Sequence, residues 1–119
     1  MEHLLHYVWK HKLFPLQILQ TTEGLRVEVI DSGLQNSDAG PDFFNAKLKI
    51  DGTLWVGNIE IHTHSSDWYR HGHNNDKAYD SVILHVVEEA DTEVTRSDGE
   101  TIPQLRLTCP ENIQTHYHE

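Results

Sequence analysis

The chain has 119 residues, which suits a single domain with one packed core. Hydrophobic residues make up 37% of it and charged residues 24%, as in an ordinary globular protein. The formal net charge of −10, with Lys and Arg scattered along the chain, disfavours broad contact with phosphate backbones. No apolar stretch approaches the roughly 20 residues that cross a bilayer, and the single cysteine excludes an internal disulfide. We therefore expect a cytoplasmic protein with no membrane partner.

The first predicted element is a helix from Glu2 to about Lys12, which Pro15 ends. Its apolar residues recur at helical spacing on one face: Leu4, Leu5, Val8 and Trp9. The histidines of this segment then lie mostly on the solvated side, where we expect no special role for them: His3, His6 and His11.

Two hairpins are predicted next. The first pairs Leu16–Thr21 with Leu25–Asp31, because apolar and polar residues roughly alternate there. The second pairs Phe43–Ile50 with Thr53–His62 across Asp51-Gly52, which is a strong two-residue turn signal.

Loop and helix signals surround the second hairpin. Residues 32–41 are rich in Ser, Gly, Asn and Asp, which is typical of a loop. After the hairpin, Ser65-Ser66-Asp67 can cap a short helix that runs towards Ala78. Gly72 weakens that helix, so we expect it to be broken.

The last part of the chain is predicted to add strands. Ser81–Glu88 is apolar almost throughout, as expected of a strand buried on both faces. Glu93–Arg96 and Thr101–Leu107 predict a C-terminal β-hairpin. The order of elements predicts one α+β domain over residues 1–110, with a mixed or antiparallel sheet and a frayed tail at 111–119.

Glu60 and His62 lie two apart on a predicted strand and therefore share one face. With Asp42 across the hairpin, they form the candidate catalytic and metal-binding set. Carboxylate oxygens and an imidazole nitrogen suit Mg²⁺ or Mn²⁺, with Zn²⁺ as the alternative.

The expected register works against this set. With a two-residue turn, Asp42 faces Ile61 and lies on the opposite face from Glu60. The site therefore needs irregular backbone before Asp42 or a β-bulge, for which Gly57 is a plausible position.

Histidines offer a second constellation, because five of the ten lie between positions 62 and 85. A metal centre built on His62 would draw on weaker candidate ligands nearby: His64, His71 and His73. His85 lies inside the buried strand, where a hydrogen-bonded core residue is the simpler interpretation.

The candidate site resembles the motif of the PD-(D/E)XK nuclease superfamily. Pro41-Asp42, a hairpin and Glu60-x-His62 match it, with histidine in place of lysine, and the order of elements is similar to its αβββαβ core. The resemblance implies a restriction-endonuclease-like fold with a mixed central sheet. It further implies that Asp42 and Glu60 bind a divalent metal for phosphodiester cleavage, that His62 stands in for the lysine, and that nucleic acid is the partner.

Longer stretches resemble an uncharacterised family of hypothetical bacterial proteins, a domain of unknown function. These stretches are Ala39–Phe43, Gly57–His62, Asp67-Trp68 with His71–His73, and Leu84–Val87. Members of that family are usually longer, so the resemblance implies a short version or an N-terminal fragment.

Three functions remain open on the sequence. The first is a metal-dependent nuclease-like phosphodiesterase, active or degenerate. The second is a binding or scaffold domain without catalysis, which the acidic charge favours. The third is a histidine-centred metal-binding β-rich protein.

Overall fold

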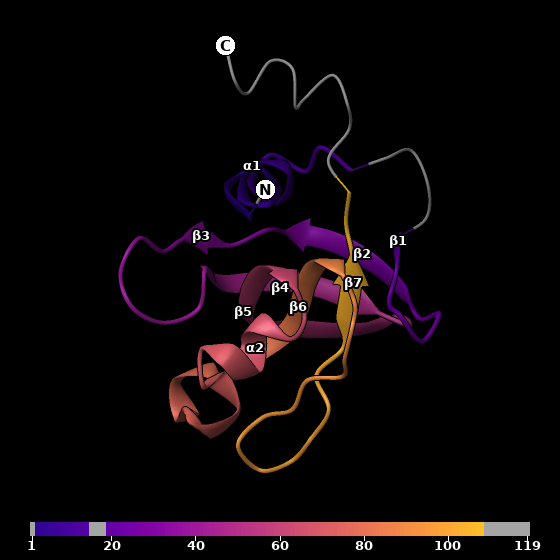
Figure 1. Cartoon of the computed structure of the whole chain (residues 1–119). Coiled ribbons are helices and arrows are strands. Elements are labelled where there is room, and N and C mark those ends of the chain that lie inside the picture. Colours follow the sequence, from indigo (N-terminus) through magenta and orange to yellow (C-terminus); the bar gives the residue numbers. More distant parts are fainter. Residues whose placement is uncertain (1, 15–18, 109–119) are drawn as a thin grey trace.

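The computed structural model describes residues 2–14 and 19–108, so the expected tail at 111–119 and part of the strand expected from Leu16 lie outside the described residues. In those ranges two helices, two 3₁₀ turns and seven strands are arranged as shown in Figure 1. In chain order they are α1 (Glu2–Lys10), β1 (Leu19–Gln20), β2 (Arg26–Asp31), β3 (Leu34–Gln35), β4 (Phe43–Ile50), β5 (Thr53–His64), α2 (Asp67–Arg70), η1 (His73–Asn75), η2 (Lys77–Tyr79), β6 (Val82–Glu89) and β7 (Gln104–Arg106). Among the described helices, none is long and apolar enough to cross a membrane.

All described strands belong to one mixed sheet with the order β1-β2-β4-β5-β6-β7, and β3 pairs with β4. The pairs from β1 to β5 are antiparallel, whereas β5, β6 and β7 run parallel to one another. The sheet curls until its ends meet: Thr21 bridges Leu105, and the Thr22 amide donates to the Gln104 carbonyl at 2.9 Å. The α+β class and the mixed sheet are thus confirmed, in a nearly barrel-shaped form.

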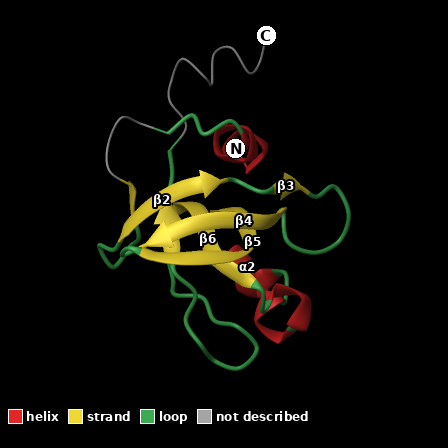
Figure 2. Cartoon of the chain, turned by 180° about the vertical axis from the view of Figure 1, so that it is seen from behind, coloured by secondary structure: helices red, strands yellow, loops and turns green. Residues whose placement is uncertain are grey.

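The two helices cover different sides of this sheet (Figures 1 and 2). The larger core lies under α1 and contains Leu5, Trp9, Phe43, Leu48, Ile59, Ile61, Leu84 and Val86 among its buried residues. A smaller core lies beside α2 and contains Trp68, Tyr79, Val82, Val94 and Ile102. Strand β6 lies between the two and is buried from Val82 to Val87, which confirms the prediction of a strand covered on both faces.

Several boundaries differ from the expected ones. Helix α1 ends at Lys10, and the expected second helix stops at Arg70 because Gly72 takes a left-handed conformation with φ 72°. The 32–41 loop contains the short strand β3, which we did not expect.

The predicted C-terminal hairpin forms only in part. Its arms share one isolated bridge, between Thr95 and Thr101, and the second arm continues into β7. Strand β7 pairs in parallel with β6 because its Leu105 side chain belongs to the larger core. Burial of this apolar residue therefore favours a place in the main sheet over a separate hairpin.

The central hairpin contains the β-bulge that the site requires, but on the other strand. Pairing runs regularly from Ile50 with Thr53 to Ala46 with Gly57, and it then shifts so that Phe43 faces Ile59. The extra residue is Asn45, which has a left-handed φ of 59°. Its amide donates to the Asn58 side-chain oxygen at 3.1 Å, and the new register brings Asp42 beside Glu60.

Gly57 has a different role from the expected one. A Cβ atom there would lie 2.4 Å from Ile83 Cγ2 and 2.9 Å from the Ser81 carbonyl oxygen. Ile83 occupies this space because the pairing of β5 with β6 also shifts, between Asn58 and Ile59. Because Gly57 has no side chain, β6 approaches β5 closely at this point, just before Glu60 and His62 on β5.

We predict that Gly57→Ala lowers the free energy of unfolding by roughly 1–3 kcal/mol, since the new methyl group overpacks the β5–β6 contact. Urea denaturation measures this change. The control is Lys49→Ala on the exposed side of β4, which should leave the stability nearly unchanged. Equal stability of Gly57→Ala and the wild type would contradict the close approach.

Candidate metal centre

A buried carboxylate lies at the middle of the site. Glu60 is on β5, only 4% exposed, and both of its oxygens are engaged. Oε1 accepts a hydrogen bond from the Asp42 amide at 3.2 Å. Oε2 lies 3.2 Å from His62 Nε2 and 2.9 Å from His73 Nε2. A buried charge is tolerated only with such compensation, so the two histidines and the carboxylate form one unit.

The surroundings of Glu60 favour its ionised form. Burial by itself raises the pKa of the carboxyl, but contacts with His62 and His73 outweigh it and lower the pKa to about 2. Glu60 is therefore an anion at neutral pH and is able to bind a cation.

The turn after α2 brings two more histidines to Glu60. The left-handed Gly72 reverses the chain between His71 and His73. The His73 ring stacks on Tyr79, with 3.6 Å between centroids, and meets Trp68 edge-on. These aromatic contacts hold the His73 ring against the sheet.

Three imidazoles converge here, because ring nitrogens of His62, His71 and His73 lie within 4.8 Å of one another. Ligands 2.0–2.1 Å from a tetrahedral ion are about 3.3–3.4 Å apart. The separations between Glu60 Oε2 and the nitrogens of His62 and His73, 3.2 and 2.9 Å, are close to that spacing. His71, which is exposed, is a further potential ligand at this place.

Behind His62 a chain of polar side chains leads into the core. His62 Nδ1 lies 2.8 Å from His85 Nε2, and His85 Nδ1 lies 2.9 Å from Gln104 Oε1. His85 is the hydrogen-bonded core residue that its strand predicts. Burial, together with the nearby His62, lowers its pKa to about 3 and keeps the ring neutral. Gln104 gave no sequence signal, because β7 was expected in a separate hairpin.

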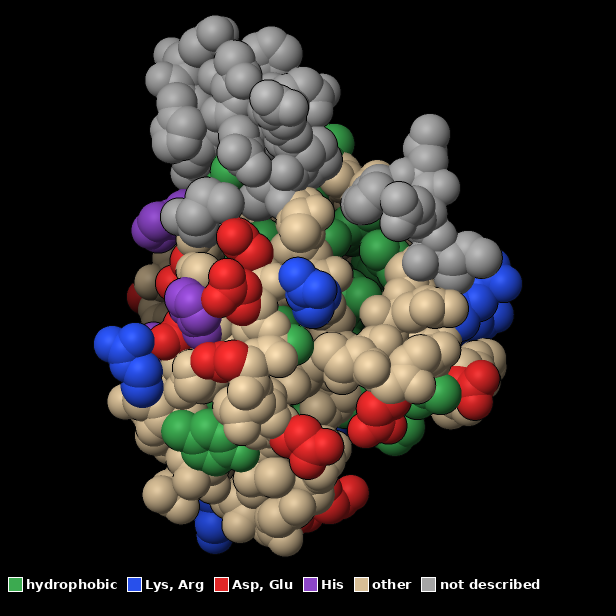
Figure 3. Space-filling view, turned by 45° about the vertical axis from the view of Figure 1, so that its right-hand side comes forward, with side chains coloured by type: hydrophobic (Ala, Val, Ile, Leu, Met, Phe, Trp, Pro, Cys, Tyr) green, Lys and Arg blue, Asp and Glu red, His purple; other side chains and the backbone are tan. Residues whose placement is uncertain are grey.

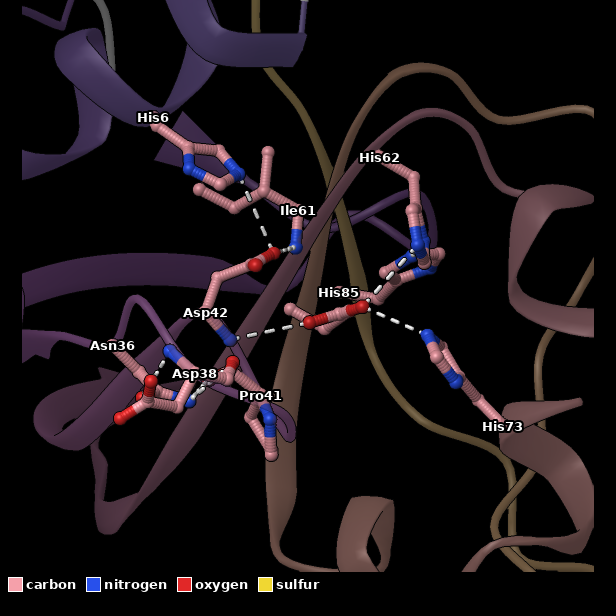
Figure 4. Close-up of polar contacts among 10 residues, drawn as sticks. His6, Asn36, Asp38, Pro41, Asp42, Ile61, His62, His73 and His85 are labelled. Atoms are coloured by element: carbon pink, nitrogen blue, oxygen red, sulfur yellow. Dashed lines mark hydrogen bonds and ion pairs between the residues drawn. The ribbon is translucent and has the colours of Figure 1, made fainter. Parts of the chain in front are cut away.

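Asp42 lies beside this unit with its carboxylate turned towards α1 (Figure 4). Its Oδ2 accepts from the Ile61 amide at 2.8 Å and lies 3.4 Å from His6 Nε2, which is an ion-pair distance. Burial raises the pKa of Asp42, the nearby Glu60 charge adds to this, and His6 opposes it. Burial lowers the pKa of His6, but Asp42 outweighs this and raises it overall. The expectation that His6 has no special role is thus wrong.

The structure brings together most of the predicted site residues. Asp42, Glu60, His62, His71 and His73 line one cavity of about 230 Å³, together with Tyr79. His64 does not join them, because it lies near the end of β5 and pairs with Glu89 at 3.0 Å. The cavity is therefore lined by both carboxylates and imidazoles.

We predict that Glu60 makes the metal-free protein sensitive to acid. Its folded-state pKa of about 2 lies below the ordinary value of 4.5, so the ionised group stabilises the fold above about pH 4.5. This contribution, at most about 3 kcal/mol, is lost as the pH falls from 4.5 towards 2. Urea denaturation in EDTA should show that the stability advantage of wild type over Glu60→Gln shrinks across this window. Exposed Glu28→Gln is the control, and an unchanged advantage would contradict the prediction.

No match to the chain was found among the curated proteins or among the solved structures. A family described as "Protein of unknown function (DUF2851)" matches residues 2–119. The match includes the buried Glu60–His62 pair, the turn that carries His71 and His73, and Asp42. The chain therefore belongs to the DUF2851 family of proteins of unknown function.

Proposed function

We propose that this domain is a metal-dependent hydrolase, in which Glu60, His62 and His73 hold a divalent transition-metal ion. The observation that carries the proposal is the approach of His62 Nε2 and His73 Nε2 to the same Glu60 oxygen, at 3.2 and 2.9 Å. Two nitrogens and one oxygen at these separations form one triangular face of a coordination site.

The charge of the cavity supports a cation. Burial raises the pKa of Tyr79 to about 12, and the negative charges of Glu60 and Asp42 add to this effect. A divalent ion beside Glu60 would offset this negative field. Imidazole-rich sites favour Zn²⁺ and related ions over Mg²⁺, so Zn²⁺ is the first expectation.

The geometry also leaves room for a substrate. Three protein ligands with an open position are typical of catalytic rather than structural zinc sites, and the ligands here face a cavity of about 230 Å³. A bound ion would polarise a phosphoryl or carbonyl oxygen and lower the pKa of a water molecule towards about 7. The chain itself would hold the ion, orient His62 from behind and keep His73 stacked on Tyr79.

We predict that the wild type binds one Zn²⁺ ion per chain in titration calorimetry. His62→Ala, His73→Ala and Glu60→Gln should each weaken binding by more than about 100-fold, because losing a ligand costs more than the roughly 10–100-fold lost with an outer-shell partner. The matched control is His11→Ala, in the exposed turn directly after α1, which should bind Zn²⁺ as the wild type does. The absence of divalent binding by the wild type would refute the proposal and leave the scaffold hypothesis.

The second candidate function is a nuclease-like phosphodiesterase, which would cleave a phosphodiester substrate. Two observations favour it: Asp42 and Glu60 line the same cavity, and the order α1, β2, β4, β5, α2, β6 is compatible with an αβββαβ core. In that case Asp42 and Glu60 would share Mg²⁺ or Mn²⁺. Acidic side chains are spread over the face in Figure 3, whereas Lys and Arg are isolated there. A nucleic acid would therefore need a basic partner to approach this face.

Hydrolysis of bis(p-nitrophenyl) phosphate separates the two candidates. If Asp42 is a metal ligand, Asp42→Asn should abolish Mg²⁺- or Mn²⁺-dependent hydrolysis and weaken Mn²⁺ binding. If the histidines hold the ion, Asp42→Asn should keep Zn²⁺ binding within a few-fold of the wild type, because Oδ2 is already engaged by the Ile61 amide. Absence of hydrolysis with all three metals would argue against phosphodiesters as substrates.

A further inference from the structure

The polar chain behind His62, which we call the relay, consists of His85 and Gln104. The direction of its hydrogen bonds is determined at its far end, where Gln104 meets the Thr92 carbonyl. Gln104 Nε2 lies 2.8 Å from the Thr92 carbonyl oxygen, which can only accept a hydrogen bond. The amide nitrogen must therefore face Thr92, and Oε1 must face His85. An amide oxygen can only accept, so His85 Nδ1 must donate across the 2.9 Å contact.

The same reasoning passes through His85 to His62. His85 is fully buried, and none of its described hydrogen bonds is to a carboxylate, so a second proton on its ring would be an uncompensated buried charge. With the proton on Nδ1, His85 Nε2 presents a lone pair. His62 Nδ1, 2.8 Å away, must then donate to it.

We propose that Gln104, acting through His85, is a positioning residue that keeps a proton on His62 Nδ1 and so reserves His62 Nε2 for a metal ion. His62 Nε2 faces Glu60 Oε2 at 3.2 Å. A lone pair opposite a carboxylate is repulsive unless a proton or a cation lies between them. The relay thus prepares this gap for a positive charge.

The consequence for metal affinity rests on the proposed metal centre, whereas the location of the proton does not. Outer-shell partners of ligating histidines are worth about 10–100-fold in metal affinity. We therefore expect Gln104→Met, which keeps the size of the side chain but removes both amide groups, to weaken Zn²⁺ binding by that factor. Gln104→Glu, protonated in this buried position, keeps an acceptor for His85 and a donor for Thr92 and should restore most of the affinity.

The proton can be observed directly by long-range ¹H–¹⁵N correlation spectra of the histidine rings. The full chain is measured in EDTA at about pH 8, and the signals of His62 are assigned by their loss in His62→Asn. We expect His62 Nδ1 to carry a proton in the wild type and in Gln104→Glu, and to lose it in part in Gln104→Met. A merely structural role of Gln104 would leave this pattern unchanged.

The outcomes separate the two proposals. Unprotonated Nδ1 in wild-type His62 would overturn the relay, even if Gln104→Met does not fold. Unchanged Zn²⁺ affinity in folded Gln104→Met would overturn it too, with exposed Gln20→Met as the control for the substitution itself. Protonated Nδ1 in a wild type that binds no divalent ion would support the positioning role and refute the metal centre instead.

Discussion

The rest of the site depends on one constraint: a carboxylate placed inside a sheet must be surrounded by donors. Glu60 is nearly inaccessible to solvent, yet its surroundings hold it ionised. Its donors come from Asp42 just before β4, from β5 itself and from the turn after α2. Because only His62 is close to Glu60 in the sequence, full compensation of the charge requires the central hairpin and the turn after α2 to be in place.

Two local irregularities allow this arrangement. The bulge at Asn45 changes the register of β4 against β5, so that the Asp42 amide reaches Glu60. The pairing of β6 with β5 also shifts next to Gly57, where Ile83 fills the space, and His85 then pairs with Glu60 across the parallel strands. Without these shifts the polar row on β5 would face other partners. The irregular backbone therefore determines which side chains meet.

Much of this could be predicted from local patterns. The alternation around Asp51-Gly52 gave the central hairpin, and the apolar run from Ser81 gave the strand buried on both faces. The register argument also required either a β-bulge or irregular backbone before Asp42. The argument could not locate the bulge, because Asn occurs both in regular strands and in the left-handed conformation that Asn45 adopts, so the residue type does not distinguish the two.

The errors have a common physical origin in long-range packing. His6 lies on the less buried side of α1, and only the placement of the helix against β5 brings it to Asp42. Gln104 has no local signal, because its role arises from parallel pairing with β6. Strand spacing predicted that Glu60 and His62 share one face, but it gave His73 only as a weaker candidate, because the burial of His73 at 6% and the partners behind His62 follow from tertiary structure alone.

The closure of the sheet between Thr21 and Leu105 has a consequence for the order of folding. These residues are more than 80 positions apart, and the carbonyl of Gln104 is one of the groups that join the two ends. Bringing such distant segments together is entropically costly and is expected late, after the local hairpins have formed. The polar contacts behind His62 join residues only 19 and 23 positions apart, so they can form before the sheet closes, and the metal-binding residues can assemble ahead of the closed sheet.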